Sequence, residues 1–143
     1  MDARKILMIP GPTEVSPDVL YEMSKPVFPH YGADWVRTYT DTTEKMKLIF
    51  QTEGDLFILV GSGSAALEAC ILSSISPGDK VLVISSGFFG DRLKEIVAAD
   101  GGRVVPIDVQ LGDSVKPEAV DEQLAENTDI RLVVAVHCET STG

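Results

Sequence analysis

Four short runs of mostly apolar residues, rich in β-branched side chains, constrain the fold of this 143-residue chain more than any other feature. Continuous rather than alternating apolar runs are typical of strands that are buried on both faces of a parallel sheet. We therefore expect a parallel sheet whose strands are joined by crossover segments. The four runs lie at 56–60, 81–84, 104–109 and 132–136.

Helical patterns fill the intervals between these runs. Pro77 and Gly78 follow the first, Gly101 follows the second, and Pro117 opens the third, as expected at helix ends and starts. The order strand–helix–strand, with right-handed crossovers, predicts an α/β fold in three layers, α/β/α, with a mostly parallel sheet. The expected helices lie at 64–75, 90–99 and 117–125.

The first fifty residues have a different pattern. We interpret residues 1–16 as an N-terminal arm, because the Pro-Gly-Pro sequence at 10–12 fits neither a helix nor a central strand. Ser16 followed by Pro17 predicts the start of a short helix. Apolar residues at helical spacing then predict a long amphipathic helix over 34–51. Residues 17–143 are interpreted as the N-terminal part of a larger domain, because a covering helix is expected after the last strand.

Charge and composition exclude several classes of function. Twelve Lys and Arg against 22 Asp and Glu give a net charge of −10, which disfavours nucleic acid and anionic membranes as partners. No stretch has the length of a membrane span or the pattern of a signal peptide, and two cysteines do not form a disulfide framework. Two histidines are too few for a usual zinc site, so we expect no metal. These features favour a cytoplasmic protein.

The first predicted strand runs directly into Gly61-Ser62-Gly63-Ser64 and a helix. Glycine N–H groups, serine hydroxyls and the positive end of a helix can together hold a phosphate. A tight strand-to-helix turn capped by Ser64 is the alternative. The formal dinucleotide pattern that ends at Ala66 lacks an acidic residue at the end of the next strand, so a dinucleotide site is the weaker interpretation.

Two more predicted strands end in sequences suited to a ligand, and the carboxyl ends of parallel strands share one edge of a sheet. Phe88 and Phe89 lie between two glycines, where an aromatic ring could stack on a flat heteroaromatic group or pack inward. Residues 137–143 are rich in hydroxyl groups. A phosphate cradle, a stacking ring and hydroxyls together suggest a phosphorylated aromatic cofactor such as pyridoxal 5′-phosphate.

Five motifs in the same order make the chain resemble a known family over essentially its whole length. The family is the class V, fold type I, pyridoxal-phosphate-dependent aminotransferases, in particular the alanine–glyoxylate and serine–pyruvate branch. The motifs are Ile9-Pro10-Gly11-Pro12-Thr13, Gly61-Ser62-Gly63-Ser64-Ala65-Ala66-Leu67-Glu68-Ala69, Pro77-Gly78-Asp79-Lys80, Gly87-Phe88-Phe89-Gly90-Asp91-Arg92 and Glu139-Thr140-Ser141-Thr142-Gly143.

The resemblance implies a large domain with a seven-stranded sheet, a small C-terminal domain and a homodimer. It also implies roles for six residues. Ser62, Gly63 and Ser64 would hold the cofactor phosphate, Phe89 would stack on the pyridine ring, Thr140 would bond near the phenolic oxygen, and Gly11 would line the substrate pocket.

The same resemblance places the family's Schiff-base lysine, its pyridine-facing aspartate and its carboxylate-binding arginine beyond residue 143. We therefore assign no catalytic residue and expect this chain alone to be inactive. The implied activity of the parent enzyme is transamination between alanine or serine and glyoxylate or pyruvate. The alternatives are a class V lyase or cysteine desulfurase, and a non-catalytic phosphate- or nucleotide-binding α/β module.

Overall fold

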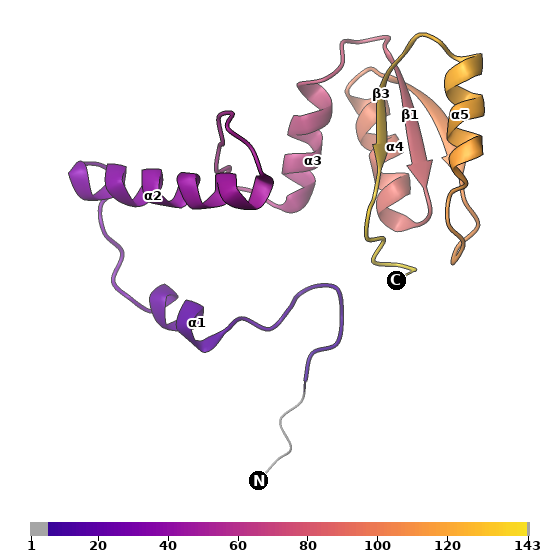
Figure 1. Ribbon diagram of the computed structural model, residues 1–143. Coiled ribbons are helices and arrows are strands. Elements are labelled where there is room, and N and C mark those ends of the chain that lie inside the picture. Colours follow the sequence, from indigo (N-terminus) through magenta and orange to yellow (C-terminus); the bar gives the residue numbers. More distant parts are fainter. Residues whose placement is uncertain (1–5, 143) are drawn as a thin grey trace. The chain divides into compact units, whose positions relative to one another are not determined.

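The computed structural model describes residues 6–142 and divides the chain into two compact units, Met1–Leu59 and Val60–Gly143 (Figure 1). Each unit is described by itself. The elements in chain order are α1 (Pro17–Met23), α2 (Ala33–Phe50), α3 (Gly63–Leu72), β1 (Lys80–Ser85), α4 (Phe88–Ala99), β2 (Arg103–Asp108), α5 (Pro117–Glu126) and β3 (Ile130–Ala135).

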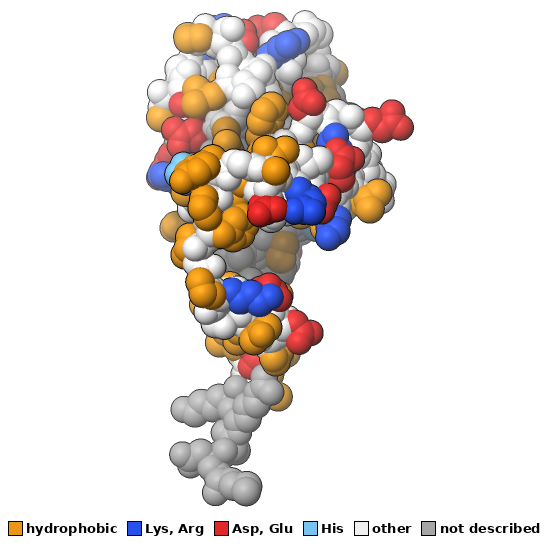
Figure 2. All heavy atoms as spheres, turned by 90° about the vertical axis from the view of Figure 1, so that its left-hand side faces the viewer, with side chains coloured by type: hydrophobic (Ala, Val, Ile, Leu, Met, Phe, Trp, Pro, Cys, Tyr) orange, Lys and Arg blue, Asp and Glu red, His pale blue; other side chains and the backbone are white. Residues whose placement is uncertain are grey.

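Within residues 6–59, the first unit consists of two helices and irregular segments. Ser16 precedes α1 and Pro17 is its first residue, as predicted. The 18-residue α2 confirms the predicted long helix and ends at Phe50, and the C-cap residue Gln51 adopts a left-handed conformation with φ 51°. Only Thr43 is buried among the helical residues of this unit. Figure 2 shows hydrophobic side chains over much of the surface that it turns toward the viewer.

The second unit contains a parallel three-stranded sheet in the order β2-β1-β3, which confirms three of the four predicted strands. β1 is central, and its residues Val81, Leu82 and Val83 are fully buried. Figure 1 shows α3 and α4 on one side of the sheet and α5 on the other, as expected for three layers.

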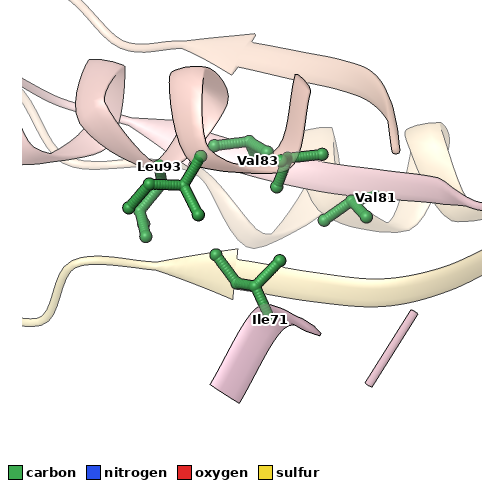
Figure 3. Close-up of a cluster of buried hydrophobic side chains, with 6 residues drawn as sticks. Ile71, Val81, Val83 and Leu93 are labelled. Carbon is green, nitrogen blue, oxygen red and sulfur yellow. The ribbon is translucent and has the colours of Figure 1, made fainter. Parts of the chain in front are cut away.

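The core of this unit lies between the sheet and the pair α3 and α4. Side chains alternate between the faces of a strand, so Val81 and Val83 point into this core while Leu82 points toward the α5 side. Burial of each large aliphatic side chain contributes about 1.5–3 kcal/mol. The buried cluster, part of which Figure 3 shows, comprises Ile71, Val81, Val83, Leu93, Ile96 and Val97.

The edge strand β2 contains a proline, which a central strand would not tolerate. The N–H groups of Arg103 and Val109 donate to the carbonyls of Asp79 and Ser85 (both 2.8 Å), so odd-numbered residues of β2 bond toward β1. Pro106 therefore faces away from β1, and its missing N–H removes no hydrogen bond from the sheet.

The prediction of a strand at 56–60 is wrong. This segment has no regular secondary structure, and Phe57 and Val60 are largely exposed. A strand forms only when its N–H and C=O groups pair with a neighbour. Within residues 6–142, the three strands of the sheet pair with one another and none pairs with this segment.

Helix boundaries differ from the predicted ones by a few residues. The predicted helix over 64–75 ends at Leu72, because the hydroxyls of Ser73 and Ser74 donate to the carbonyls of Ala69 (2.6 Å) and Cys70 (2.7 Å). Such bonds compete with continuation of the helix.

Candidate functional site

The site predicted from the sequence lies at the carboxyl edge of the sheet in the second unit. β1 and β3 are parallel and therefore end at the same edge. Figure 1 shows α3 running opposite to β1, so that α3 and α4 both begin at the end of the unit where these strands finish. Two helix N-termini, each with the partial positive charge of N–H groups that have no partner within the helix, therefore face the same side.

The N-terminus of α3 is open. Ser62 precedes the helix in an extended conformation, and its side chain makes no capping hydrogen bond. The Ser62 carbonyl accepts from the N–H groups of Ala65 and Ala66, whereas those of Gly63 and Ser64 have no acceptor within residues 6–142. A side chain added at Gly63 would meet nothing within 4 Å. Unpaired N–H groups, two hydroxyls and open space form a donor set that suits a phosphate.

The alternative prediction, a turn capped by Ser64, is wrong in its assignment of the cap. Ser62 occupies the capping position, and Ser64 lies within the first turn of α3. The hydroxyl of Ser64 is thus placed at the helix start beside the free N–H groups.

The N-terminus of α4, in contrast, is closed by Glu139 from the loop after β3. The N–H groups of Phe89 and Gly90 donate to Oε2 of Glu139 at 2.9 and 3.1 Å. The N–H and the hydroxyl of Ser141 donate to Oε1 at 3.2 and 3.0 Å. Ser141 Oγ also accepts the N–H of Phe88 at 3.0 Å. The two loops, about fifty residues apart in sequence, are held together by one carboxylate.

Glu139 is 4% exposed, and two opposing effects act on its pKa. Burial raises the pKa of the carboxyl, whereas hydrogen bonds from Gly90, Ser141 and Phe89 favour the charged form and lower it. The net pKa of Glu139 lies below its ordinary value, so the group is a carboxylate at neutral pH.

Close packing of the β1–α4 turn supports this arrangement. A Cβ on Gly90 would lie 2.5 Å from Cα of Ser85, and one on Gly87 would lie 2.6 Å from Cγ of Glu139. The buried hydroxyl of Ser85 donates to Asp91 Oδ1 at 2.8 Å. Two hydrogen bonds lower the pKa of Asp91. The one from Lys94 has the larger effect and the one from Ser85 the next. The start of α4 is thus fixed against the end of β1.

The predicted site residues of the second unit fall into two groups. Phe89 is half-buried, and its ring meets that of the exposed Phe88 edge to face at a centroid distance of 5.3 Å. Thr140 is exposed between Glu139 and Ser141. The structure therefore brings together the two predicted strand ends at 85–90 and 137–142. No hydrogen bond within residues 6–142 joins this group to Ser62, Gly63 or Ser64.

The predicted substrate residue Gly11 belongs to the first unit. It is exposed, and a Cβ placed on it would meet nothing within 4 Å. Glu139, the residue that organises the α4 side of the site, was not predicted. The signal in the sequence is a single acidic residue in a polar loop that follows an apolar strand, but its partner, the N-terminus of α4, becomes visible only in the fold.

In the second unit, a cavity of about 290 Å³ opens beside Glu139, between the ends of β1 and β3 and the loop before α5. Hydroxyls, the carboxylates of Asp113 and Glu139 and an imidazole line its polar side. The lining residues are Ile84, Ser86, Asp113, Ser114, Val115, Ala135, Val136, His137, Glu139 and Thr142.

Across residues 6–142, helices are too short or too polar to cross a bilayer.

Comparison with known proteins gives sequence relatives, although no family model matches. An uncharacterised aminotransferase of Methanocaldococcus jannaschii is 49% identical over 140 residues (98% of this chain, 36% of the relative). A protein of Anabaena cylindrica named as the 42 kDa subunit of a soluble hydrogenase is 37% identical (100% and 38%). The (S)-ureidoglycine–glyoxylate transaminase of Bacillus subtilis is 34% identical (97% and 33%).

Solved structures give the same result. The ureidoglycine–glyoxylate aminotransferase of Bacillus subtilis matches with a TM-score of 0.88 at 33% identity, over 100% of this chain and 38% of that chain. The alanine–glyoxylate aminotransferase of Nostoc sp. also has a TM-score of 0.88, at 31% identity and the same coverage.

By sequence and fold, the chain is therefore similar to aminotransferases of the class V pyridoxal-phosphate fold. Glyoxylate aminotransferases recur among these relatives and solved structures. The chain spans somewhat more than a third of the length of most of the relatives named above.

Proposed function

We propose that this chain forms the phosphate and ring site for pyridoxal 5′-phosphate in an aminotransferase. The observation that carries the proposal is the open N-terminus of α3, at the same end of the unit as the fixed loops around Phe89 and Thr140. An unsatisfied donor set at the same end of the unit as an aromatic side chain and a hydroxyl suits the phosphate, the flat ring and the polar substituents of this cofactor.

Each proposed residue has one task. Ser62, Gly63 and Ser64 bind the phosphate through hydroxyl and N–H donors. Phe89 covers one face of the ring and excludes water from it, and Thr140 donates to an oxygen of the cofactor. When bound, the cofactor supplies an electron sink for the substrate amino acid.

We propose further that the polypeptide to which this chain belongs transfers an amino group between a small amino acid, alanine or serine, and a 2-oxo acid, glyoxylate or pyruvate. Glyoxylate recurs in the names of the Bacillus subtilis and Nostoc relatives, while the amino donor differs between them. This pattern favours glyoxylate as the acceptor. In this proposal Gly11 lines the substrate pocket, and the protein is a cytoplasmic homodimer.

Calorimetric titration with pyridoxal 5′-phosphate tests the cofactor site. The double variant Ser62→Ala/Ser64→Ala removes two phosphate donors, so we expect its Kd to rise at least tenfold. The matched control Ser73→Ala/Ser74→Ala removes two hydroxyls at the opposite end of α3 and should bind as the wild type does. Pyridoxal, which lacks the phosphate, should bind both proteins equally weakly.

Equal affinity of the Ser62→Ala/Ser64→Ala variant and the wild type would contradict the phosphate assignment. Tighter binding of AMP than of pyridoxal 5′-phosphate would favour the nucleotide-binding module instead. Turnover of cysteine rather than alanine or serine by the longer protein would favour a class V desulfurase.

The lysines offer a separate check. Lys80 bonds to Asn127 (3.1 Å) and Asp129 (2.8 Å), and Lys94 pairs with Asp91 and Asp108. We expect no covalent cofactor adduct on this chain after borohydride reduction and mass spectrometry. A specific adduct at one lysine would contradict the assignment of the covalent lysine to a region beyond residue 143.

A further inference from the structure

Glu139 has a role that the cofactor contacts alone do not assign. We propose that it is a positioning residue, whose carboxylate fixes Phe89 and Thr140 relative to each other and thereby shapes the ring site. This inference rests on the proposed function, because it concerns the same cofactor site.

The division of labour between the two carboxylate oxygens carries the argument. Oε2 accepts two N–H groups from the first turn of α4, one of them from Phe89 itself. Oε1 accepts both donors of Ser141, the residue after Thr140. Thr140 is therefore held on both sides, by Glu139 before it and Ser141 after it, while Phe89 is held directly.

Only a carboxylate satisfies this set of donors. Glu139 is buried, and no ion pair joins it to a cation within residues 6–142, so its charge is balanced by N–H and O–H donors and by the start of α4. Glutamine has one acceptor oxygen and one NH₂ group. In either orientation its NH₂ would face donors, and one of the two loops would be released.

The charge of Glu139 also makes the two helix N-termini at this edge differ in their affinity for an anion. The carboxylate occupies the start of α4, so an anion there would meet a negative charge and find its N–H groups already bonded. The start of α3 has no such occupant within the described residues. Glu139 thus directs a phosphate toward Ser62, Gly63 and Ser64 while it holds the ring contacts in place.

The experiment compares Glu139→Gln and Ser141→Ala with the exposed control Glu122→Gln in the full chain. Three properties are measured: amide hydrogen exchange at Phe89 and Gly90 without cofactor, the Kd for pyridoxal 5′-phosphate, and the induced circular dichroism of the saturated complex. The last property reports ring geometry in the folded fraction, so a loss of stability alone would not change it.

We expect Glu139→Gln to expose the Phe89 and Gly90 amides to exchange, to raise the Kd about tenfold and to change the induced dichroism at saturation. Ser141→Ala removes the hydroxyl that donates to Oε1 of Glu139 and accepts the N–H of Phe88, but it keeps the bonds from Phe89 and Gly90 to Oε2. It should leave exchange at Phe89 unchanged, raise the Kd about threefold and change the dichroism. Glu122→Gln should match the wild type in all three.

Wild-type affinity and dichroism in Glu139→Gln would overturn the positioning role while leaving the cofactor proposal intact. If that variant does not fold, Ser141→Ala decides in the same way. A wild-type chain without saturable binding of pyridoxal 5′-phosphate would instead overturn the proposed function, and the positioning role with it.

Discussion

Gly90 shows how a single missing side chain sets the position of a helix. Its first-turn position lets α4 approach the backbone of Ser85 so closely that an added Cβ would lie 2.5 Å from Ser85 Cα. Neither backbone can move without disturbing the buried cluster behind it. The close approach also places Phe89 and the N–H groups of α4 within reach of Glu139.

We predict that Gly90→Ala destabilises the second unit by about 1–3 kcal/mol, because overpacking forces the helix away from the strand. The matched control is Gly63→Ala, in the first turn of α3, where the added methyl meets open space. That variant should be neutral, or more stable by up to about 1 kcal/mol. Urea unfolding followed by far-ultraviolet circular dichroism measures both. Equal stabilities would show that the β1–α4 approach is not tight.

The lowered pKa of Glu139 predicts that the free energy of unfolding depends on pH. Its pKa in the folded chain lies below the ordinary value of 4.5, so its contribution is complete above about pH 4.5 and is lost as the pH falls through the folded-state pKa. The wild type should therefore lose more stability than Glu139→Gln between pH 7 and about pH 3.5.

Urea unfolding at the two pH values measures this difference. Glu122→Gln, on the exposed surface of α5, should keep the acid sensitivity of the wild type. A Glu139→Gln variant that is as acid-sensitive as the wild type would indicate that other carboxyl groups cause the loss.

Local chemistry was sufficient to predict a helix start with phosphate donors at this scale. Ser62 through Ser64 were predicted because glycine, serine and a helix start have the same meaning in any fold, and the structure places them at the start of α3. Glu139 was not, because an acidic side chain in a loop has no distinctive local pattern. Its role depends on a helix about fifty residues earlier in the chain.

At the scale of elements, three predicted strands formed and one did not. The runs in β1, β2 and β3 and the segment 56–60 have similar composition, so propensity alone does not distinguish them. Pairing does, because the parallel partners of β1 come from the next two crossover units. Helix starts such as Ser16-Pro17 were predicted well because their signals lie within a few residues.

We predict that amide hydrogen exchange separates these segments. The N–H groups of 56–60 have no strand partner in the described part of the chain and should exchange rapidly, whereas those of Val81, Leu82 and Val83 should be strongly protected. Mass spectrometry of deuterated peptides resolves the two regions. Protection of 56–60 comparable to that of β1 would mean that this segment has found a partner in solution.

For the molecule as a whole, exposed apolar side chains and net charge have opposite effects on self-association. Val27, Leu48 and Val60 are 99%, 78% and 107% exposed, and the surface includes many other large apolar side chains. Exposed apolar surface favours association, whereas a net charge of −10 opposes it. The balance between them depends on ionic strength.

We therefore predict that the chain binds a hydrophobic dye such as ANS in its native state, and that it self-associates more strongly at 1 M than at about 0.05 M salt as the charges are screened. Dye fluorescence and light scattering measure the two effects. Weaker association at high salt would indicate that ion pairs, rather than apolar contacts, join the copies.

Pro106 determines which edge of the sheet can accept a further strand. Its ring occupies the outer border of β2, where an incoming strand would find a carbonyl but no matching donor. The outer border of β3 has no proline and keeps every backbone N–H. Any strand that extends this sheet, whether from the same polypeptide or from another, is therefore expected to join beside β3.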